Sequence, residues 1–380
     1  MNMKVINTGN NYRIYDSSMR TFNELPPQVY NVCFDEQRGW SLQKYSDDIE
    51  LKEKVYGVHL EKVNKVLNSF SQFNRNLGII LSGDKGIGKS LFSKMLAQNA
   101  IAAGYPLIVV SSYIPGIASF IDSISQECIV LFDEFDKTFS AAKTHDPQTE
   151  MLSLFDGVSQ GKKLFVITCN SLIGLNDFLV NRPGRFHYHF RFEYPSDSEI
   201  TEYMKDKLDE KYWEEIPNVV SFSKKVALNY DCLRAISFEL NNGLSFTEAI
   251  KDLNIINVNA ERYFVTAHFT DGSILEGRRD GESIDMFSSE KDYTYLYTDK
   301  GHNYCDLSFT PMLAKYDIEK HCLVLSSENA SLLWSHSDED IEHWNDEIKT
   351  KRADFLSWRN KKLDYVTFNR KYEKQLHYTV

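Results

Sequence analysis

Cysteines are few, and none stands in a metal-binding or redox pattern. The six cysteines are scattered singly, with no CxxC pair and no histidine cluster at metal-ligand spacing, which predicts reduced thiols and a reducing compartment. The first residues, MNMKVINTGNNYRIYD, lack the apolar core of a signal peptide, and no run approaches the ~20 apolar residues that a membrane helix needs. We therefore expect a cytoplasmic protein without a membrane segment.

Positive charge is in deficit, because 43 Lys and Arg residues stand against 54 Asp and Glu residues and the formal net charge is -11. This balance argues against a surface that binds nucleic acid throughout, although a local basic patch is compatible with it. The hydrophobic content of 42% and the charged content of 26% are those of an ordinary globular protein. A chain of 380 residues is long enough for two or three domains.

Four segments differ in their sequence patterns. Residues 1–50 are strand-rich, residues 51–195 alternate apolar runs with helical patterns, residues 196–254 are helical, and residues 255–380 combine β-hairpins with a charged helical tail. A capping box, Ser196 with Glu199, opens the helical segment, and Asp271-Gly272 marks a hairpin turn in the last one. The second segment contains apolar runs without alternation, which predict strands of a parallel sheet covered on both faces, at 77–81, 106–110, 128–132, 164–168 and 186–194.

A glycine-rich loop follows the first of these runs. The stretch LSGDKGIGKSLF, residues 81–92, fits G-x-x-x-x-G-K-[ST] between a predicted strand and a predicted helix. Glycines let backbone N–H groups turn around phosphate oxygens, Lys89 reaches the β and γ phosphates, and the Ser90 hydroxyl binds Mg²⁺. Lys85 is a charge that the pattern does not require, and we expect its ammonium in solvent. The residues predicted to bind the nucleotide here are Gly83, Asp84, Lys85, Gly86, Ile87, Gly88, Lys89, Ser90 and Leu91.

Two carboxylates and an amide follow later apolar runs. In CIVLFDEFDK, Asp133 can orient the water on Mg²⁺ and Glu134 can polarise the attacking water, whereas Asp136 is interpreted as a solvated acid. Asn170 ends the run LFVITCN, where its amide could orient the same water. A last pair, Arg182 and Arg185 of NRPGRF, is either a set of rim salt-bridge partners or a source of guanidinium groups for a γ phosphate.

This ordered series resembles the AAA+ ATPases over about residues 51–250, and within them the AAA group, whose second region of homology stands here as LNDFLVNRPGRFHY. The layout, one ATPase module with a small appended domain, resembles stand-alone ATPases of bacteria and phages. By this resemblance the fold is α/β, a P-loop NTPase parallel sheet with a helical lid and a C-terminal α+β accessory domain. The implied roles are Walker A for Lys89 and Ser90, Walker B for Asp133 and Glu134, sensor 1 for Asn170, and arginine fingers for Arg182 and Arg185.

The resemblance also implies how such a protein works. ATP and Mg²⁺ are the expected substrate and cofactor, and a site completed by a neighbour's arginine implies a homo-oligomeric ring, which in this family is most often a hexamer. Val55, Tyr56 and Gly57 look like the segment that contacts adenine, and Arg234 in YDCLRAI looks like sensor 2, although the AAA group usually lacks that arginine. Tyr113, Ile114 and Gly116 offer an aromatic pore loop, but this loop follows its strand unusually early.

Three functions stay open from the sequence. The first is a ring ATPase that remodels or translocates a protein client. The second is a nucleic-acid factor such as a helicase loader, since residues 349–374 hold nine Lys or Arg against three acids, interleaved with Phe355, Trp358, Tyr365, Phe368 and Tyr372. The acidic stretch SDEDIEHWNDEI before it favours simple pairing of two helices instead. The third is a switch in which ATP sets the oligomeric state.

Overall fold

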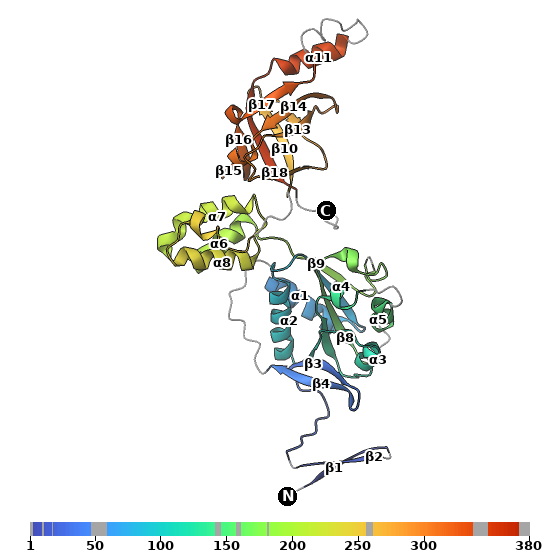
Figure 1. Cartoon of the computed structure of the whole chain (residues 1–380). Coiled ribbons are helices and arrows are strands. Elements are labelled where there is room, and N and C mark those ends of the chain that lie inside the picture. Colours follow the sequence, from blue (N-terminus) through green and yellow to red (C-terminus); the bar gives the residue numbers. More distant parts are fainter. Residues whose placement is uncertain are drawn as a thin grey trace. The chain divides into compact units, whose positions relative to one another are not determined.

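The computed structural model describes residues 3–9, 11–16, 18–46, 59–140, 146–156, 161–180, 182–255, 261–336 and 349–371. The chain divides into two compact units, residues 1–194 and residues 195–380, and each is described by itself (Figure 1).

The first unit is built on a seven-stranded sheet with the order β4-β3-β6-β7-β8-β5-β9. Five neighbouring strands, from β6 to β9 in this order, run parallel to one another. Every residue of β5, β7 and β8 is buried, which confirms the prediction of a mostly parallel sheet with both faces covered. The bounds are β5 (Leu77–Ser82), β6 (Leu107–Val110), β7 (Cys128–Phe132), β8 (Lys163–Cys169) and β9 (Tyr188–Arg191).

Helices cover the two faces of this sheet (Figure 1). Leu77, Ile79 and Leu81 of β5 share one hydrophobic core with the two longer helices, whereas Ile80 faces the core formed with the short helices. Alternate residues of one strand thus pack on opposite faces. The longer helices are α1 (His59–Gln72) and α2 (Lys89–Ala102), and the short ones are α3 (Ile117–Asp122), α4 (Phe135–Thr138) and α5 (Pro147–Phe155).

Part of the strand-rich N-terminal segment joins this sheet. Strand β3 (Val29–Asp35) runs parallel to β6, and β4 (Gly39–Ser46) pairs antiparallel with β3 at the edge. The indole of Trp40 in β4 stacks on Phe120 of α3, with ring centroids 5.2 Å apart. Strands β1 (Lys4–Thr8) and β2 (Asn11–Tyr15) form a separate hairpin. Residues 29–46 therefore belong to the α/β layer.

The second unit begins with helices. Ser196 and Glu199 form the predicted capping box at the start of α6 (Asp197–Lys207). A second capping box, Ser245 with Glu248, starts the short helix α9 (Phe246–Ala249). The other elements are η2 (Glu210–Glu215), α7 (Ile216–Ser223) and α8 (Tyr230–Asn241).

The rest of the second unit is a curled antiparallel sheet with the order β15-β16-β18-β10-β11-β13-β14-β17, and β12 pairs with β10 beside this path. Its core includes Val265, Phe309, Leu323 and Phe368. Gly272 occupies the predicted turn between β10 and β11 with a φ of 83°. The bounds are β10 (Glu261–Phe269), β11 (Ile274–Glu276), β12 (Glu282–Ile284), β13 (Asp292–Tyr297), β14 (Asn303–Phe309), β15 (Lys315–Asp317), β16 (Cys322–Ser326), β17 (Ala330–Trp334) and β18 (Leu363–Arg370).

The prediction of a charged helical tail is wrong for residues 363–370. Residues 349–359 do form a helix, α11 (Lys349–Arg359), but β18 is a strand between β16 and β10. Val366 and Phe368, two residues apart, are buried in the sheet's core. Branched and aromatic side chains with this period favour a strand, and the surrounding lysines and arginines obscured the pattern.

The expectation of a cytoplasmic protein was based on reduced cysteines and on the lack of an apolar membrane helix. All six cysteines are free thiols, and four of them are buried: Cys128, Cys169, Cys305 and Cys322. Burial raises the pKa of Cys169 to about 12, so this thiol stays protonated. None of the described helices has both the length and the apolar character that crossing a membrane requires.

Candidate active site

The glycine-rich loop joins β5 to α2 and has the backbone that its glycines permit. Gly83, Gly86 and Gly88 have φ values of 140°, 74° and 105°, which side chains rarely allow. A Cβ on Gly83 would lie 2.4 Å from Ile87 Cδ1 and 2.4 Å from the carbonyl oxygen of Phe192. The loop therefore needs glycine for its shape, and it ends at the N-terminus of a helix, where unpaired N–H groups and the helix dipole favour phosphate.

Lys89 is the first residue of α2, and its side chain turns back across the loop. Its ammonium donates hydrogen bonds to the carbonyl oxygens of Gly83 and Asp84, the latter at 2.7 Å, and to Asn170 Oδ1 at 3.0 Å. Burial lowers the pKa of Lys89, and the carboxylates of Asp84, Asp136 and Asp133 act in the opposite direction. The structure thus brings the predicted phosphate lysine and the predicted sensor amide into contact.

The two carboxylates predicted as Walker B follow β7, and a residue that the sequence did not reveal holds them in place. Thr168 of β8 is buried, and its hydroxyl donates to Asp133 Oδ1 at 2.7 Å. The same hydroxyl accepts the backbone N–H of Glu134 at 2.8 Å. A threonine inside an apolar run gives no signal of its own, so only the pairing of β7 with β8 identifies it.

Glu134 has an unusual backbone and an exposed carboxylate. Its φ of 46° lies in the left-handed region, which costs free energy for any residue but glycine and often marks a functional turn. Its carboxylate forms an ion pair with Lys137, one turn further along α4. The hydrogen bond from Lys137 lowers the pKa of Glu134, so the group is ionised at neutral pH.

The interpretation of Asp136 as a solvated acid is wrong. Its Oδ2 accepts the backbone N–H groups of Asn170 at 3.0 Å and of Ser171 at 3.4 Å, so it holds the turn that presents the Asn170 amide. Its Oδ1 is buried and has no hydrogen-bond partner among the described residues. A third acid two residues after Glu134 was the available signal.

The residues at this edge of the sheet fit a nucleotide with Mg²⁺. The loop is shaped so tightly that Gly83 leaves no room for a Cβ, and a buried carboxylate oxygen of Asp136 has an unused acceptor position. Mg²⁺ prefers oxygen ligands and usually keeps several waters when it binds phosphates. The exposed Ser90 hydroxyl and the Asp133 carboxylate would hold it, and Lys85 is also exposed, as expected.

The two arginines have different surroundings. Arg185 is 8% exposed and donates to Asp156 Oδ2 at 2.6 Å through Nη2, to Asp156 Oδ1 through Nε, and to the carbonyl oxygen of Phe178 at 2.7 Å. Its guanidinium is therefore bound within its own subunit. Arg182 is exposed, and it begins a turn. Its carbonyl oxygen accepts a hydrogen bond from the backbone N–H of Arg185, which closes that turn.

The remaining predicted residues belong to other parts of the chain. Val55, Tyr56 and Gly57 lie outside the described residues. Arg234 lies on α8 in the second unit, where its guanidinium is 3.5 Å from Asp231. Tyr113 packs edge-on against Phe139, with ring centroids 5.6 Å apart, and its hydroxyl donates to Glu150.

The surroundings of Tyr113 also change its acidity. Burial, followed by the hydrogen bond to Glu150, raises the pKa of Tyr113 to about 12. The ring is partly buried and packs against the core beside α5, which includes Phe139. Ile114 beside it is partly buried as well.

Comparison with known proteins points to the same region. The family model described as "ATPase family associated with various cellular activities (AAA)" matches residues 79–194. The chain is 29% identical to the ATP-dependent zinc metalloprotease FTSH 9, chloroplastic/mitochondrial, of Oryza sativa subsp. japonica, over 39% of this chain and 22% of that protein. It is 22% identical to the 26S proteasome regulatory subunit S10B homolog B of Arabidopsis thaliana, over 64% of this chain and 62% of that protein.

A bacterial relative also matches only part of the chain. The chain is 24% identical to the ATP-dependent zinc metalloprotease FtsH 2 of Phytoplasma mali (strain AT), over 49% of this chain and 30% of that protein. In none of the three does the match reach two thirds of the relative's length, so their full activities are not implied for this chain. Residues 79–194 are an AAA ATPase domain, and the activity that such a domain implies is the hydrolysis of ATP.

Proposed function

We propose that the chain hydrolyses ATP with Mg²⁺ at sites shared between neighbouring copies in a ring, and that it uses this hydrolysis to remodel or translocate a protein client. The observation that carries the proposal is the position of the Lys89 ammonium between the loop carbonyls and Asn170 Oδ1. A phosphate oxygen is a stronger partner for an ammonium than a peptide carbonyl, because the bond joins two charged groups. The lysine is thus poised to exchange its contacts for those of a bound triphosphate.

Each polar residue then has a defined task. The loop N–H groups and the end of α2 bind phosphate oxygens, and Lys89 contacts the β and γ phosphates. Mg²⁺, held by Ser90 and Asp133, supplies positive charge that offsets the charge on the phosphates. Glu134, ionised at neutral pH, accepts the proton of the attacking water, and the Asn170 amide orients that water.

Asp136 and Thr168 act on these groups indirectly. Asp136 holds the turn at Asn170, so the amide keeps its place when Lys89 leaves it for phosphate. Thr168 joins Asp133 to the backbone of Glu134, which fixes the distance between the metal ligand and the base. Both contacts reduce the reorganisation needed during the reaction.

We assign the two arginines different roles. Arg182 is exposed and is the guanidinium available to a neighbouring copy, whereas Arg185 anchors the loop through Asp156 and Phe178. A site that lacks its arginine in the monomer requires an oligomer, and a hexameric ring is the assembly that the resemblance favours. Val55–Gly57 as the adenine segment and Arg234 as sensor 2 stay predictions.

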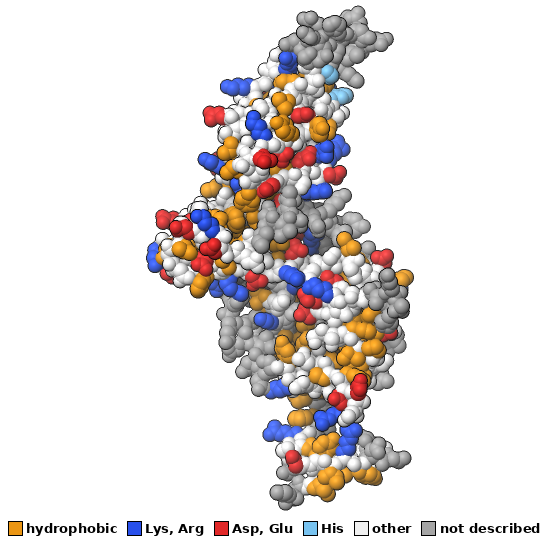
Figure 2. All heavy atoms as spheres, in the orientation of Figure 1, with side chains coloured by type: hydrophobic (Ala, Val, Ile, Leu, Met, Phe, Trp, Pro, Cys, Tyr) orange, Lys and Arg blue, Asp and Glu red, His pale blue; other side chains and the backbone are white. Residues whose placement is uncertain are grey.

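A protein client is favoured over nucleic acid. Two of the three relatives are named as zinc metalloproteases and the third as a proteasome regulatory subunit, and these names favour a protein client. In residues 349–371, Phe355 and Phe368 are 0% and 1% exposed, so these rings cannot stack on bases. Figure 2 shows basic and acidic side chains interspersed over the C-terminal sheet on the face drawn. We do not assign client contact to Tyr113, because its ring packs within its own domain.

The test is Glu134→Gln. We expect ATP binding to persist and kcat to fall by roughly 10²–10⁴-fold, because the water loses its general base. The variant should accumulate as an ATP-bound oligomer, which electron microscopy and light scattering would detect. Glu127→Gln is the matched control, since Glu127 is an exposed acid of the same domain that pairs with Lys162. Turnover close to that of the parent chain in Glu134→Gln would refute the assignment.

A further inference from the structure

The last residue of β5, Ser82, is held by the strands on both sides of it just before the glycine-rich loop, residues 83–90, begins. β5 pairs in parallel with β8 and with β9. On the β9 side, the carbonyl oxygen of Ser82 accepts the backbone N–H of Phe192 at 2.8 Å. On the β8 side, the N–H of Gly83 donates to the carbonyl oxygen of Cys169 at 3.3 Å. The main chain at the root of the loop is therefore fixed from two directions.

A contact between side chains adds to these backbone bonds. Ser82 is 5% exposed, and its Oγ forms a hydrogen bond of 2.6 Å with Nε2 of His189 in β9. The strand register places His189 opposite Ile80, and side chains two residues apart on a strand share one face, so the imidazole and the hydroxyl lie on the same face of the sheet. A buried hydroxyl without a partner costs free energy. His189 therefore both satisfies Ser82 and fixes its place.

β9 and the residue after it also hold the helix that follows the loop. The ring centroids of Phe190 and Phe192 lie 5.9 and 5.7 Å from that of Phe92 in the first turn of α2. Because alternate side chains of a strand point to opposite faces, Phe190 and His189 act on different sides of the sheet. Residues 188–192 thus contact the chain on both flanks of the loop.

Gly83, which follows Ser82, connects this contact to the predicted phosphate lysine. Its carbonyl oxygen accepts a hydrogen bond from the Lys89 ammonium, so the resting position of the lysine depends on where Gly83 lies. The freedom of Gly83 is small, because a Cβ at this residue would lie 2.4 Å from the carbonyl oxygen of Phe192. A shift of Ser82 would therefore displace both the start of the loop and Lys89.

We propose that Ser82 and His189 are positioning residues for ATP binding, and that their hydrogen bond holds the root of the glycine-rich loop in the shape that receives phosphate. A loop that is already ordered loses less conformational freedom when the nucleotide binds. This inference rests on the proposed function, in which residues 83–90 bind the phosphates. It goes beyond that function by assigning a role to two residues outside the G-x-x-x-x-G-K-[ST] pattern.

The first test is His189→Leu in the full chain. Leucine fills a similar space with an apolar side chain, so the hydrogen bond is lost while the loop sequence stays intact. We expect the KM for ATP and the Kd of a fluorescent ATP analogue to rise about fivefold, the effect of one hydrogen bond of ordinary strength, with kcat within about twofold of the parent. His187→Leu is the matched control, since His187 is an exposed histidine two residues earlier whose ring packs against Phe73; its KM should not change.

Further variants separate positioning from simple stabilisation. His189→Gln keeps a donor and an acceptor at a similar reach, so its KM should return to within about twofold of the parent. Ser82→Ala removes the hydroxyl from the other side, and it should raise KM about as much as His189→Leu does. The double variant should raise KM no further than the stronger single change, because both changes break the same bond. A merely structural contact would lower the melting temperature of these variants and leave KM unchanged.

The outcomes distinguish the positioning role from the proposed function. A raised KM in His189→Leu and Ser82→Ala that His189→Gln restores would support the positioning role. The parent's KM in both would overturn it, and so would a fall in kcat without a rise in KM; if His189→Leu does not fold, Ser82→Ala decides.

Lys89→Ala tests the phosphate site itself. If this variant binds the ATP analogue as tightly as the parent does, the proposed function fails and the positioning role with it. If Lys89→Ala loses binding while Ser82→Ala and His189→Leu behave like the parent, only the positioning role fails.

Discussion

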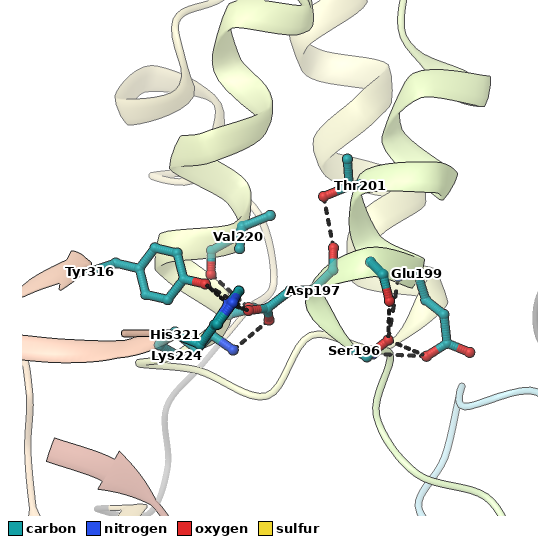
Figure 3. A network of polar contacts seen from close by, with 10 residues as sticks. Ser196, Asp197, Glu199, Thr201, Val220, Lys224, Tyr316 and His321 are labelled. Carbon is teal, nitrogen blue, oxygen red and sulfur yellow. Dashed lines mark hydrogen bonds and ion pairs between the residues drawn. The ribbon is translucent and has the colours of Figure 1, made fainter. Parts of the chain in front are cut away.

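The two units of the chain place their polar contacts differently. In the first unit, the glycine loop, Asp133 and Asn170 all follow strands of a parallel sheet, and the carboxyl ends of such strands meet at one edge. In the second unit the sheet is antiparallel, and one of its polar contacts joins Tyr316 to Asp197 of α6, 119 residues earlier in the chain (Figure 3). A local motif can therefore reveal the polar residues of the first unit, whereas only the folded chain reveals the contact between Asp197 and Tyr316.

The largest expected difference comes from substituting one glycine in each unit and comparing the two variants. Gly83→Ala places a Cβ 2.4 Å from the Phe192 carbonyl oxygen, which cannot withdraw easily because the Phe192 N–H bonds to Ser82. We expect ATP binding and hydrolysis to fall to background. Gly272 also has a positive φ, but nothing lies within 4 Å of its Cβ position. Gly272→Ala should keep full ATPase activity and lower the melting temperature by about 2–4 °C.

Equilibrium binding of a fluorescent ATP analogue, the ATPase rate and a thermal melt would measure both variants. Equal loss of activity in the two would show that the turn of the second unit matters to the site as much as the phosphate loop does, which contradicts the comparison.

The next largest effect distinguishes the two arginines of the first unit. Arg182→Ala should lower kcat by roughly 10³-fold without changing stability, as is typical of an arginine supplied to a phosphoryl group. Arg185→Ala should lower the free energy of unfolding by about 2 kcal/mol, because three hydrogen bonds are lost while the half-exposed Asp156 can be rehydrated. Urea unfolding and the steady-state ATPase rate measure the two quantities.

Mixing tests whether Arg182 acts on a neighbouring copy. Arg182→Ala retains its own Lys89, and Lys89→Ala retains its own Arg182, so a mixed ring contains some sites with both residues. We expect the mixture to recover activity that neither variant has alone. No recovery, with both variants shown to enter the same oligomer, would mean that the arginine serves its own subunit.

The smallest effect concerns an acid of the second unit that shapes a turn. The Ser273 hydroxyl, the Ser273 N–H and then Lys361 lower the pKa of Asp271 to about 2. An unfolded aspartate titrates near ~3.9, so its contribution to stability is present above that pH and is lost as the pH falls towards 2. The difference in melting temperature between the parent and Asp271→Asn should be greatest at pH 5, small at pH 2 and absent below it. A constant difference over this range would exclude a role for the ionised carboxylate.

Much of the first unit could be predicted from sequence because its signals are local. Unbroken apolar runs mark buried parallel strands. A phosphate loop has to be contiguous to wrap phosphate, so Lys89 and Ser90 can be predicted from spacing alone. Thr168 and Asp156 were missed, because each becomes significant only through a partner on another element. The role of Asp136 was misread for the same reason, since its hydrogen bonds reach the turn after β8.

The second unit was predicted less well because its pairings are distant in sequence. Hairpin turns such as Asp271-Gly272 are local and were identified, but the place of β18 between β16 and β10 depends on strands that lie far earlier in the chain. Lysines and arginines flank residues 363–370 and suggested a charged helix, but burial of Val366 and Phe368 in the sheet outweighs that signal.

The position of β18 also determines when this sheet can assemble during synthesis. Phe368 of β18 pairs with Val265 of β10 on one side and with Leu323 of β16 on the other. The two earlier strands can therefore join one sheet only after residues 363–370 have left the ribosome. The α/β unit is complete by residue 194 and can fold while the rest is being translated. During that interval β10 can pair with β11 and β12, but its other edge has no partner, and an open strand edge is prone to pair with other chains.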